Sequence, residues 1–288
     1  MTHRAGGVSR HVVTSNLNEL FRSVVAMAIG LAFFFPVYFM ISSAFKAESE
    51  ILASPIHWIP NEFQGLDQLY RAEEIAPLGR YFLNSSLLSV INVVVTVFFS
   101  ALAGYGFARF NFRGRTLLFY FVISTMMIPL QILIVPSFVE VRTLGWTNSY
   151  LGLIAPGIMN AFGVFMMRQH AYGVPEEIIE AGRIDGANEF QIFLRLILPL
   201  LAPALASLAI IIFIWSWGSF LWPLVAVNDQ RLTVLSVGLT NYSQPYQRTP
   251  MWGAAMAAST IATLPMLAIF VFFQRYLIRG ITAAAVKA

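Results

Sequence analysis

EEIIEAGRIDGANEFQIFLRLILPLLAP, residues 176–203, is the most polar long run in the second half of the chain. Five acidic residues stand between Glu176 and Glu189, yet strongly apolar segments flank the run on both sides. Pro175 suits the first turn of a helix, where the helix dipole also favours the acids that follow it. We therefore expect a helix to about Ile184, ended by Asp185-Gly186, because glycine readily takes the left-handed cap conformation.

A second short helix is predicted after this turn. Asn188 and Gln191 resemble a capping pair, which satisfies the free amides of a helix start. An apolar stripe follows at helical spacing, formed by Phe190, Phe193, Leu194 and Ile197. Pro199 and Pro203 then bend the chain into the next apolar segment. The run predicts helix, tight turn, helix; a solvated connecting loop is the alternative, because charge runs often only face water.

The composition identifies an integral membrane protein. Hydrophobic residues make up 58% of the 288 residues and charged residues 11%, with a mean hydropathy of +0.70. So few charges could not cover a soluble domain of this size. The net charge of +4 does not indicate nucleic-acid binding, because the basic residues stand singly at the ends of apolar runs. The absence of cysteine excludes disulfides and thiolate metal sites.

Six segments are long and apolar enough to span a bilayer, which needs about 20 such residues. We predict an all-α fold in one transmembrane domain over residues 1–288, with six transmembrane helices and a cytoplasmic loop at 168–198. The first segment is too long for a signal-peptide core and is interpreted as a retained span. The predicted spans are residues 23–45, 84–108, 117–139, 148–167, 203–226 and 252–274.

The orientation follows from lysine and arginine, which favour the cytoplasmic side of short loops. Of the 18 basic residues, twelve fall on the side of the two termini and six on the other. We therefore expect both termini in the cytoplasm. The twelve are Arg4, Arg10, Arg22, Arg109, Arg113, Arg115, Arg168, Arg183, Arg195, Arg275, Arg279 and Lys287; the six are Lys46, Arg71, Arg80, Arg142, Arg231 and Arg248.

Small residues recur every four positions in two of the segments. They are Ser100, Gly104 and Ala108 in the second, and Ala254, Ala258 and Ala262 in the sixth. This spacing lets helix backbones approach closely in lipid. Two interpretations stay open, packing within the chain and an interface with another membrane subunit.

The spans contain no visible source of energy or catalysis. None carries Asp, Glu, Lys, Arg or His in its core, where ion-coupled carriers usually place an ionisable group, although Na⁺ can be held by backbone carbonyls alone. The chain has no G-x-x-x-x-G-K-[ST] phosphate loop, no H-E-x-x-H spacing and no G-x-S-x-G turn. We expect no catalytic residues and no metal site, and infer that a partner supplies the energy.

The run EAGRIDGANEFQIFLRLILP resembles the E-A-A-x-x-x-G coupling motif of binding-protein-dependent ABC importer permeases. More narrowly, it is similar to the maltose-type carbohydrate branch, with E-A-A-x-x-D-G-A…F…I-x-L-P. Gly182 departs from the pattern, where alanine is usual, and is expected to loosen the first helix. The matching residues are Glu180, Ala181, Asp185, Gly186, Ala187, Phe193, Leu198 and Pro199.

Further stretches resemble the same branch, so that the resemblance covers the chain from about residue 20 to its end. They are YGFARFNFRGR (105–115), MMIPLQILIVP (126–136), SFLWPL (219–224) and RGITAAAVKA (279–288). The family commonly has Asn-Asp before F-L-W-P-L, whereas this chain has Gly218-Ser219. The departure affects the position where the family implies a contact with carbohydrate.

The resemblance implies a type I ABC importer permease in the cytoplasmic (inner) membrane of a bacterium or archaeon. Such a permease pairs with a second, similar permease to form the pathway for a sugar or oligosaccharide. Two cytoplasmic ATPase subunits, which hold ATP and Mg²⁺, receive the coupling loop at residues 176–199. An extracytoplasmic binding protein delivers the solute, and this chain binds no cofactor of its own. The implied coupling residues are Glu180, Ala181, Gly182, Asp185, Gly186 and Ala187.

Candidates for the solute pathway are polar or aromatic residues within the spans. Gln131, between Pro129 and Pro136, and Asn160 could bond sugar hydroxyls or join helices. Trp217, with Trp215 and Trp222, could stack on sugar rings or form an interfacial belt. Ser219 stands at the departure noted above. The outer loop from Asn228 to Pro250, with Tyr242, Tyr246 and Arg248, could meet the binding protein or be plain solvated loop.

Two rival functions remain at this point, an ion-coupled carrier that works alone and a membrane scaffold that transports nothing. Transport by the chain alone in proteoliposomes, driven only by an ion gradient, would establish the first. Unchanged solute uptake after deletion of the gene would establish the second.

The basic-residue bias predicts the sidedness of single cysteines, which the natural chain lacks. Cysteines at Ser137 or Ser243 should react with an impermeant thiol reagent in intact cells. A cysteine at Asn188 should react only after the cells are opened. Labelling of Asn188→Cys from outside would reverse the orientation.

Overall fold

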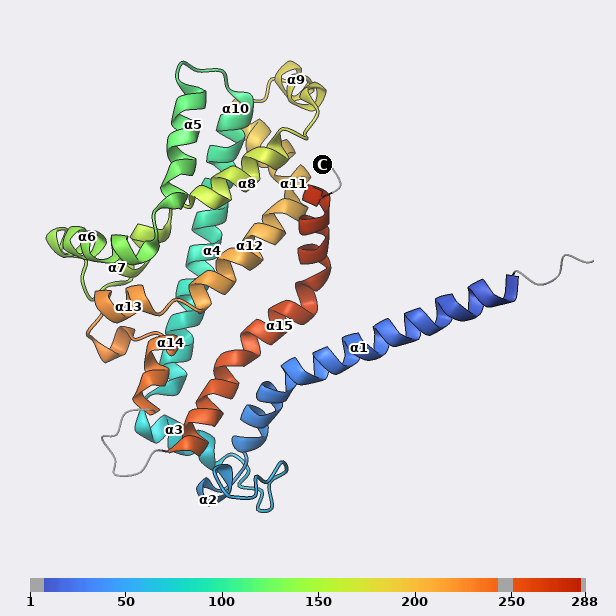
Figure 1. Ribbon diagram of the computed structural model, residues 1–288. Helices are drawn as coiled ribbons and strands as arrows, with labels where there is room; N and C mark the ends of the chain where they lie inside the picture. Colours follow the sequence, from blue (N-terminus) through green and yellow to red (C-terminus); the bar gives the residue numbers. More distant parts are fainter. Residues whose placement is uncertain (1–7, 243–250, 286–288) are drawn as a thin grey trace, which may run out of the picture. The chain divides into compact units, whose positions relative to one another are not determined.

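A computed structural model describes residues 8–242 and 251–285 of the chain, and side chains over 19–242 and 251–274 (Figure 1). These two ranges hold helices and turns with no β-strand, which confirms the all-α prediction. Several residues used in the sequence argument lie outside the described residues or side chains: Arg4, Arg10, Arg275, Arg279, Lys287, Ser243, Tyr246 and Arg248.

Fifteen α-helices form the described chain, with short 3₁₀ and π segments between them. The α-helices are α1 (Val8–Ser43), α2 (Glu48–Ile51), α3 (Asp67–Ile75), α4 (Leu78–Arg109), α5 (Arg115–Ser124), α6 (Leu130–Thr143), α7 (Tyr150–Ile154), α8 (Ala161–Ala171), α9 (Glu176–Ile184), α10 (Glu189–Ile192), α11 (Leu198–Leu200), α12 (Ala202–Trp217), α13 (Leu221–Ala226), α14 (Leu235–Gly238) and α15 (Trp252–Ala285). The 3₁₀ segments are Thr125–Met127, Ala155–Gly157, Gln230–Leu232 and Leu239–Tyr242, and Phe193–Ile197 is π-helical.

The chain forms two compact units. One comprises Met1–Ala72 with Pro245–Thr260, and the other comprises Glu73–Gln244 with Ile261–Ala288. In the first unit, the carboxylate of Glu48 accepts hydrogen bonds from the backbone N–H groups of Trp252 and Gly253. The Glu48 carboxylate thus caps backbone N–H groups in the first turn of α15, which have no partner within the helix. The prediction of one domain over residues 1–288 stays a prediction.

Three helices are continuous and long enough to cross a membrane: Glu19–Ser43 of α1, Leu78–Arg109 and Trp252–Gln274 of α15. They agree with the predicted spans 23–45, 84–108 and 252–274. Three further helix pairs pass the same test of length and composition only when each pair is taken together, because each is sharply bent. Six spans result when every bent pair counts as one.

The segment predicted as the third span, 117–139, is broken into two helices. Arg115–Met127 and Leu130–Thr143 meet at 104°. Pro129 has no N–H to donate, and Ile128 before it is extended (φ −86°, ψ 115°), as the residue before proline prefers to be. Pro136, in contrast, lies inside α6.

The fourth and fifth predicted spans are also bent. Tyr150–Gly157 and Ala161–Ala171 meet at 49°, and Asn160 caps the second of these helices. Glu189–Leu200 and Ala202–Trp217 meet at 80°, between Pro199 and Pro203, which confirms the predicted bend there. The fifth span does not continue to residue 226 as one helix, because α12 ends at Trp217 and α13 begins at Leu221.

In the second unit, α4 packs closely against α8 and α12 (Figure 1). An added Cβ at Gly104 would lie 2.7 Å from both the backbone nitrogen of Arg168 and the Cβ of Met167. Ser100 and Ala108 are buried in the same helix. These small residues therefore serve packing within the chain, which decides between the two interpretations for the second span.

The close approach at Gly104 predicts an asymmetry between two glycines of α4. Gly104→Ala should destabilise the fold by about 1–3 kcal/mol, because an extra carbon in a packed contact forces the backbone apart. Gly106→Ala is the control, since nothing lies within 4 Å of its added Cβ. That change should be neutral or stabilising, by up to about 1 kcal/mol of helix propensity. Thermal unfolding midpoints in detergent measure both, and equal midpoints would contradict the packing argument.

Candidate functional site

The polar insert, residues 172–198, begins with a helix that has the predicted bounds. Pro175 is extended (φ −60°, ψ 140°) and α9 runs from Glu176 to Ile184. The helix ends in a left-handed glycine, Gly186 at φ +80°. The N–H of Gly186 bonds the carbonyl of Arg183 at 3.0 Å, and the N–H of Ala187 bonds that of Gly182 at 3.0 Å. This pair of bonds is the Schellman arrangement, which satisfies the last carbonyls of the helix.

The second helix of the insert starts with the predicted capping box. The side chain of Asn188 accepts from the N–H of Gln191 at 2.9 Å, and the side chain of Gln191 accepts from the N–H of Asn188 at 2.9 Å. Arg183 and Glu189 join the two helices across the turn, with Nε and Oε1 2.7 Å apart. This hydrogen bond raises the pKa of Arg183 above its ordinary value. The turn is therefore held by backbone, cap and ion pair together.

The underside of the insert is apolar and buried. Phe193 packs against Tyr105 of α4, with ring centroids 5.6 Å apart. The predicted stripe is only half correct, because Phe190 and Leu194 are exposed. After Ile192 the helix widens into the π segment, whose longer hydrogen-bonded turn changes which side chains face the core. The buried apolar residues of the insert are Val174, Ile179, Ile192, Phe193 and Ile197.

Gly182 faces this apolar underside. An added Cβ there would lie 2.8 Å from Cδ1 of Leu196 and 3.2 Å from Cγ1 of Ile192. We expected Gly182 to loosen the first helix; it is instead the point where α9 approaches the second helix closely. Nothing in its sequence neighbourhood signals this contact, because the partners come from the far side of the turn.

The outward face of α9 is acidic and apolar at once. Glu177, Glu180 and Ala181 are exposed, and the side chain of Ile184 is 86% exposed at the end of the helix. Asp185 and Gly186 are exposed beyond it, and Ala187 is half-buried. Of the predicted coupling residues, the structure thus brings all but Gly182 to the free side or the turn of the insert.

Arg109, at the end of α4, joins the insert to the ends of α4 and α8. Its guanidinium donates to the carbonyl of Ala171 at 2.9 Å and to the carbonyl of Val174. An ion pair joins it to Glu176, with Nη1 and Oε2 3.5 Å apart, and its side chain is only 13% exposed. Cations favour the C-terminal end of a helix, where carbonyls are free. From the sequence, Arg109 indicates only the sidedness of the chain; its contacts with the insert depend on residues more than 60 positions away.

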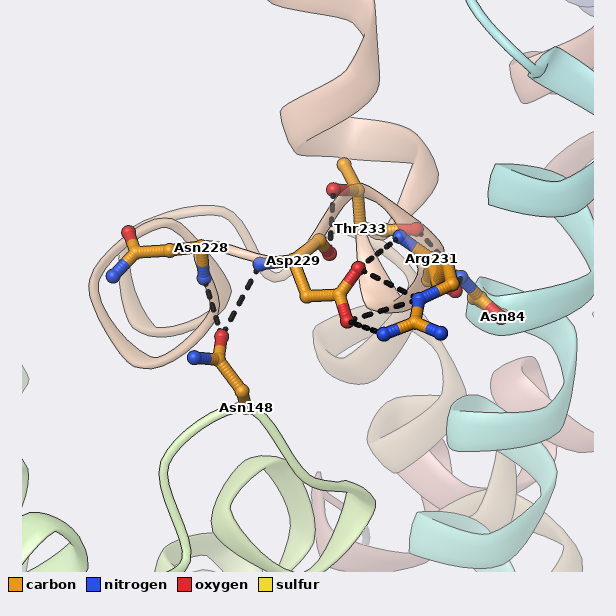
Figure 2. A network of polar contacts seen from close by, with 6 residues as sticks. All are labelled: Asn84, Asn148, Asn228, Asp229, Arg231 and Thr233. Atoms are coloured by element: carbon orange, nitrogen blue, oxygen red, sulfur yellow. Dashed lines mark hydrogen bonds and ion pairs between the residues drawn. The ribbon is translucent and has the colours of Figure 1, made fainter.

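A second polar network lies in the same unit, in the loop after α13 (Figure 2). The side-chain oxygen of Asn148, a residue at φ +53°, accepts from the N–H groups of Asn228 and Asp229 at 2.7 and 3.2 Å. Asn84 of α4 donates to the carbonyls of Arg231 and Thr233, both at 2.9 Å. The hydrogen bonds from Arg231 hold the pKa of the Asp229 carboxyl below its ordinary value. Hydrogen bonds therefore hold the described part of this loop in place; residues 243–250 lie outside the described part.

The four pathway candidates have separate surroundings. Gln131 is exposed on α6, and Asn160 is the cap of α8, accepting from the N–H of Gly163 at 2.8 Å. Trp217 is buried, donates to the carbonyl of Ala262 at 3.0 Å and stacks on Phe213 at 5.6 Å. The carbonyl of Ser219 accepts from the hydroxyl of Ser236. In the described part of the chain, no hydrogen bond or ring contact joins any two of these four side chains.

Trp215 and Trp222 also have partners inside the chain. Trp215 makes an edge contact with Phe162 at 5.5 Å, and Trp222 donates to the carbonyl of Gly152 at 3.1 Å. The three tryptophans that are close in the sequence thus have three separate partners within the chain. These contacts give the aromatic residues packing roles that sequence spacing could not reveal.

Comparisons with known proteins give one consistent family. The family model described as "Binding-protein-dependent transport system inner membrane component" matches residues 77–283. A relative in Bacillus subtilis, "Arabinooligosaccharides transport system permease protein AraQ", is 33% identical over 282 residues, which covers 96% of this chain and 99% of the relative. In Pectobacterium atrosepticum, "sn-glycerol-3-phosphate transport system permease protein UgpE" is 30% identical, covering 91% and 95%.

Solved structures share the fold. A chain of "a bacterial ABC transporter involved in the import of the acidic polysaccharide alginate" superposes with a TM-score of 0.82 at 20% identity. The match covers 96% of the present chain and 99% of that chain. The overall fold of this chain is therefore one that an experimentally solved protein also has.

The contacts of Arg109 predict that it protects the start of the insert. Arg109→Gln should raise amide hydrogen exchange at Tyr172, Gly173 and Val174 roughly tenfold or more, because a hydrogen bond to a charged group contributes about 1.5–3 kcal/mol. Arg113→Gln is the matched control, since Arg113 is exposed in the following loop. Exchange measured by mass spectrometry on the purified protein checks both. Unchanged exchange in Arg109→Gln would show that the guanidinium does not hold this segment.

Proposed function

This chain belongs to the family of binding-protein-dependent transport system inner membrane components, and we propose that it is the permease subunit of an ATP-driven carbohydrate importer. In this proposal both termini and the polar insert face the cytoplasm. The bias of basic residues supports that orientation. A second homologous permease completes the pathway, two ATPase subunits bind ATP and Mg²⁺, and an extracytoplasmic binding protein delivers the solute.

The single observation that carries the coupling role is the outward face of α9. Ile184, a large apolar side chain, is 86% exposed beside the acidic residues Glu177 and Glu180. An isolated exposed isoleucine is ordinary, but this one ends a rigid helix and lies at a fixed turn. An apolar anchor with charged neighbours suits a protein cleft that has an apolar floor and a basic rim. We assign that cleft to the ATPase subunit.

The coupling path in this chain would run through Arg109. The insert is bonded to the C-terminal end of α8 and to the end of α4 by one guanidinium. A displacement of the insert by closing ATPases would therefore move α4 and α8 together. Because these helices pack closely at Gly104, they would move as one body and open the pathway to the outer side. Hydrolysis would then reset the arrangement.

The proposed substrate is a sugar or oligosaccharide. The relative in Bacillus subtilis, named for the transport of arabinooligosaccharides, supports carbohydrate chemistry. The cores of the predicted spans carry no Asp, Glu, Lys, Arg or His, which suits a solute rich in hydroxyls. Of the candidates, Gln131 retains an exposed amide for such a solute, whereas Trp217 is buried against Phe213. Asn160 uses its carbonyl oxygen as a cap, and Ser219 contributes a carbonyl to Ser236.

Three substitutions test the coupling face. Glu180→Lys and Ile184→Ser should reduce co-purification of the ATPase and solute uptake several-fold, because each removes a contact that the docked face needs. Gly186→Val should do the same for another reason, since a β-branched residue resists φ +80°. The measurement is ATPase recovery and uptake at equal membrane levels of the permease.

The control needs the same charge change outside the insert. Glu140→Lys serves, because Glu140 is exposed near the end of α6. Glu189 is unsuitable, since it forms the ion pair that holds the turn. Wild-type attachment and uptake in both Glu180→Lys and Ile184→Ser would leave the insert a mere connecting loop.

A further inference from the structure

A short apolar lobe, residues 52–60, follows α1 and α2 and has an unusual surface. Its sequence, LASPIHWIP, contains no Asp, Glu, Lys or Arg. Four of its large apolar side chains face outward: Leu52 is 68% exposed, Ile56 51%, Trp58 48% and Ile59 70%. A water-facing loop of a stable protein usually carries polar residues instead, and a contiguous exposed apolar surface indicates an interaction.

The lobe is folded back along the last turns of α1, within the same compact unit. The ring of Trp58 lies 5.2 Å from that of Phe35 and 6.5 Å from that of Phe39, both in edge contacts. The hydroxyls of Tyr38 and Ser42 both donate to the carbonyl of Trp58, at 3.1 and 2.8 Å. The lobe therefore does not extend away from the helix end.

The depth of these contacts follows from helix geometry. Phe35 and Ser43 are eight residues apart, which is about 12 Å along a helix that rises about 1.5 Å per residue. The apolar part of α1, Glu19–Ser43, has 25 residues, and none of its most apolar window is buried inside the protein. At that rise it is about 37 Å long, slightly longer than the roughly 30 Å hydrocarbon layer. Trp58 thus lies beside the part of α1 that meets the edge of the hydrocarbon.

Two backbone carbonyls of the lobe have partners inside the protein. The carbonyl of Trp58 has two donors from α1, and the carbonyl of His57 accepts from Nζ of Lys46 at 2.7 Å. Pro55 and Pro60 have no N–H that needs a partner. Lys46 itself is fully buried, with Nζ 4.9 Å from the centre of the Phe39 ring. These two carbonyls can therefore lie at the edge of the hydrocarbon without being left unpaired. The N–H groups of residues 56–59, for which the structure shows no partner among the described residues of the protein, need the water of the headgroup layer, so the lobe lies at the boundary and does not go deeper.

We propose that the apolar lobe inserts into the boundary between headgroups and acyl chains of the phospholipid leaflet reached by the C-terminal end of α1. Trp58 is the interfacial anchor, as tryptophan commonly is at that depth, and Ile56 and Ile59 reach the acyl chains. The lipid surface fits better than a protein partner because the lobe continues the exposed apolar flank of α1 and offers no charge for a specific contact. The inference depends neither on the orientation of the chain nor on its substrate.

The lobe has a polar border that marks its water side. The carboxylate of Glu50 accepts from the N–H groups of Asn61 and Glu62, at 3.0 and 3.1 Å. The side chains of Asn61 and Glu62 are exposed directly after the lobe. The proposal therefore predicts that the surroundings change from membrane at Ile59 to water at Glu62.

Site-directed fluorescence tests it, because the chain has no natural cysteine. Ile59→Cys and Glu62→Cys, each labelled with an environment-sensitive dye, are studied in the full chain with its co-purifying subunits. The vesicles contain phosphatidylethanolamine and phosphatidylglycerol, with or without a phospholipid that carries a nitroxide near the headgroup. We expect the dye at position 59 to be blue-shifted and quenched by the nitroxide lipid several-fold more strongly than the dye at position 62. Aqueous iodide should quench them in the opposite order.

Two results would overturn the proposal. Equal iodide quenching at positions 59 and 62 would place the lobe in water. Protection of position 59 from both quenchers would mean that a protein subunit covers it. Ile56→Cys must repeat the result at position 59, and wild-type solute uptake by each variant separates this outcome from any failure of the proposed transport function.

Discussion

The close contact between α4 and α8 is the constraint on which the rest of the second unit depends. It exists because Gly104 and Gly163 leave no side chain between the two helices: an added Cβ on either would meet the facing helix. The contact fixes the two helix ends near Arg109 and Arg168. Arg168 lies over the ring of Phe119, 3.6 Å from its centre, and so positions α5 as well. The guanidinium of Arg109 joins the insert to the ends of α4 and α8.

A membrane protein with broken helices must also satisfy the backbone groups that each break exposes. At the break before α8, Asn160 accepts from Gly163, and before α7, Ser149 accepts from Gly152 at 3.1 Å. In the same way, the side chain of Asn148 accepts a hydrogen bond from the backbone of the loop after α13. Polar residues inside apolar sequence are therefore used here first as caps. Such a residue could contact a solute only through a polar atom that is not used in the cap, such as the amide nitrogen of Asn160.

The insert could be predicted from sequence because its determinants are local. Asp185-Gly186 and the pair Asn188 and Gln191 lie within seven consecutive residues, and both features appear as expected. The bend between Pro199 and Pro203 was also predicted, but the sharp breaks within the third and fourth apolar segments were not, for the opposite reason. Hydropathy is the same on both sides of Pro129, and a proline alone does not distinguish a break from a kink: Pro136 stays inside α6. Trp217 and Gly182 depend on partners distant in the chain or across a turn, which no single-sequence pattern records.

The proposed coupling role requires a stiff insert. A flexible loop pushed at its tip would absorb the displacement in its own dihedral angles. Here the Schellman bonds, the capping box and the pair of Arg183 and Glu189 restrain each torsion of the turn. Its floor is a packed apolar layer in which Phe193 meets Tyr105. Gly182 lets the side chains of Ile192 and Leu196 pack directly against the backbone of α9, so the two helices of the insert are in close contact.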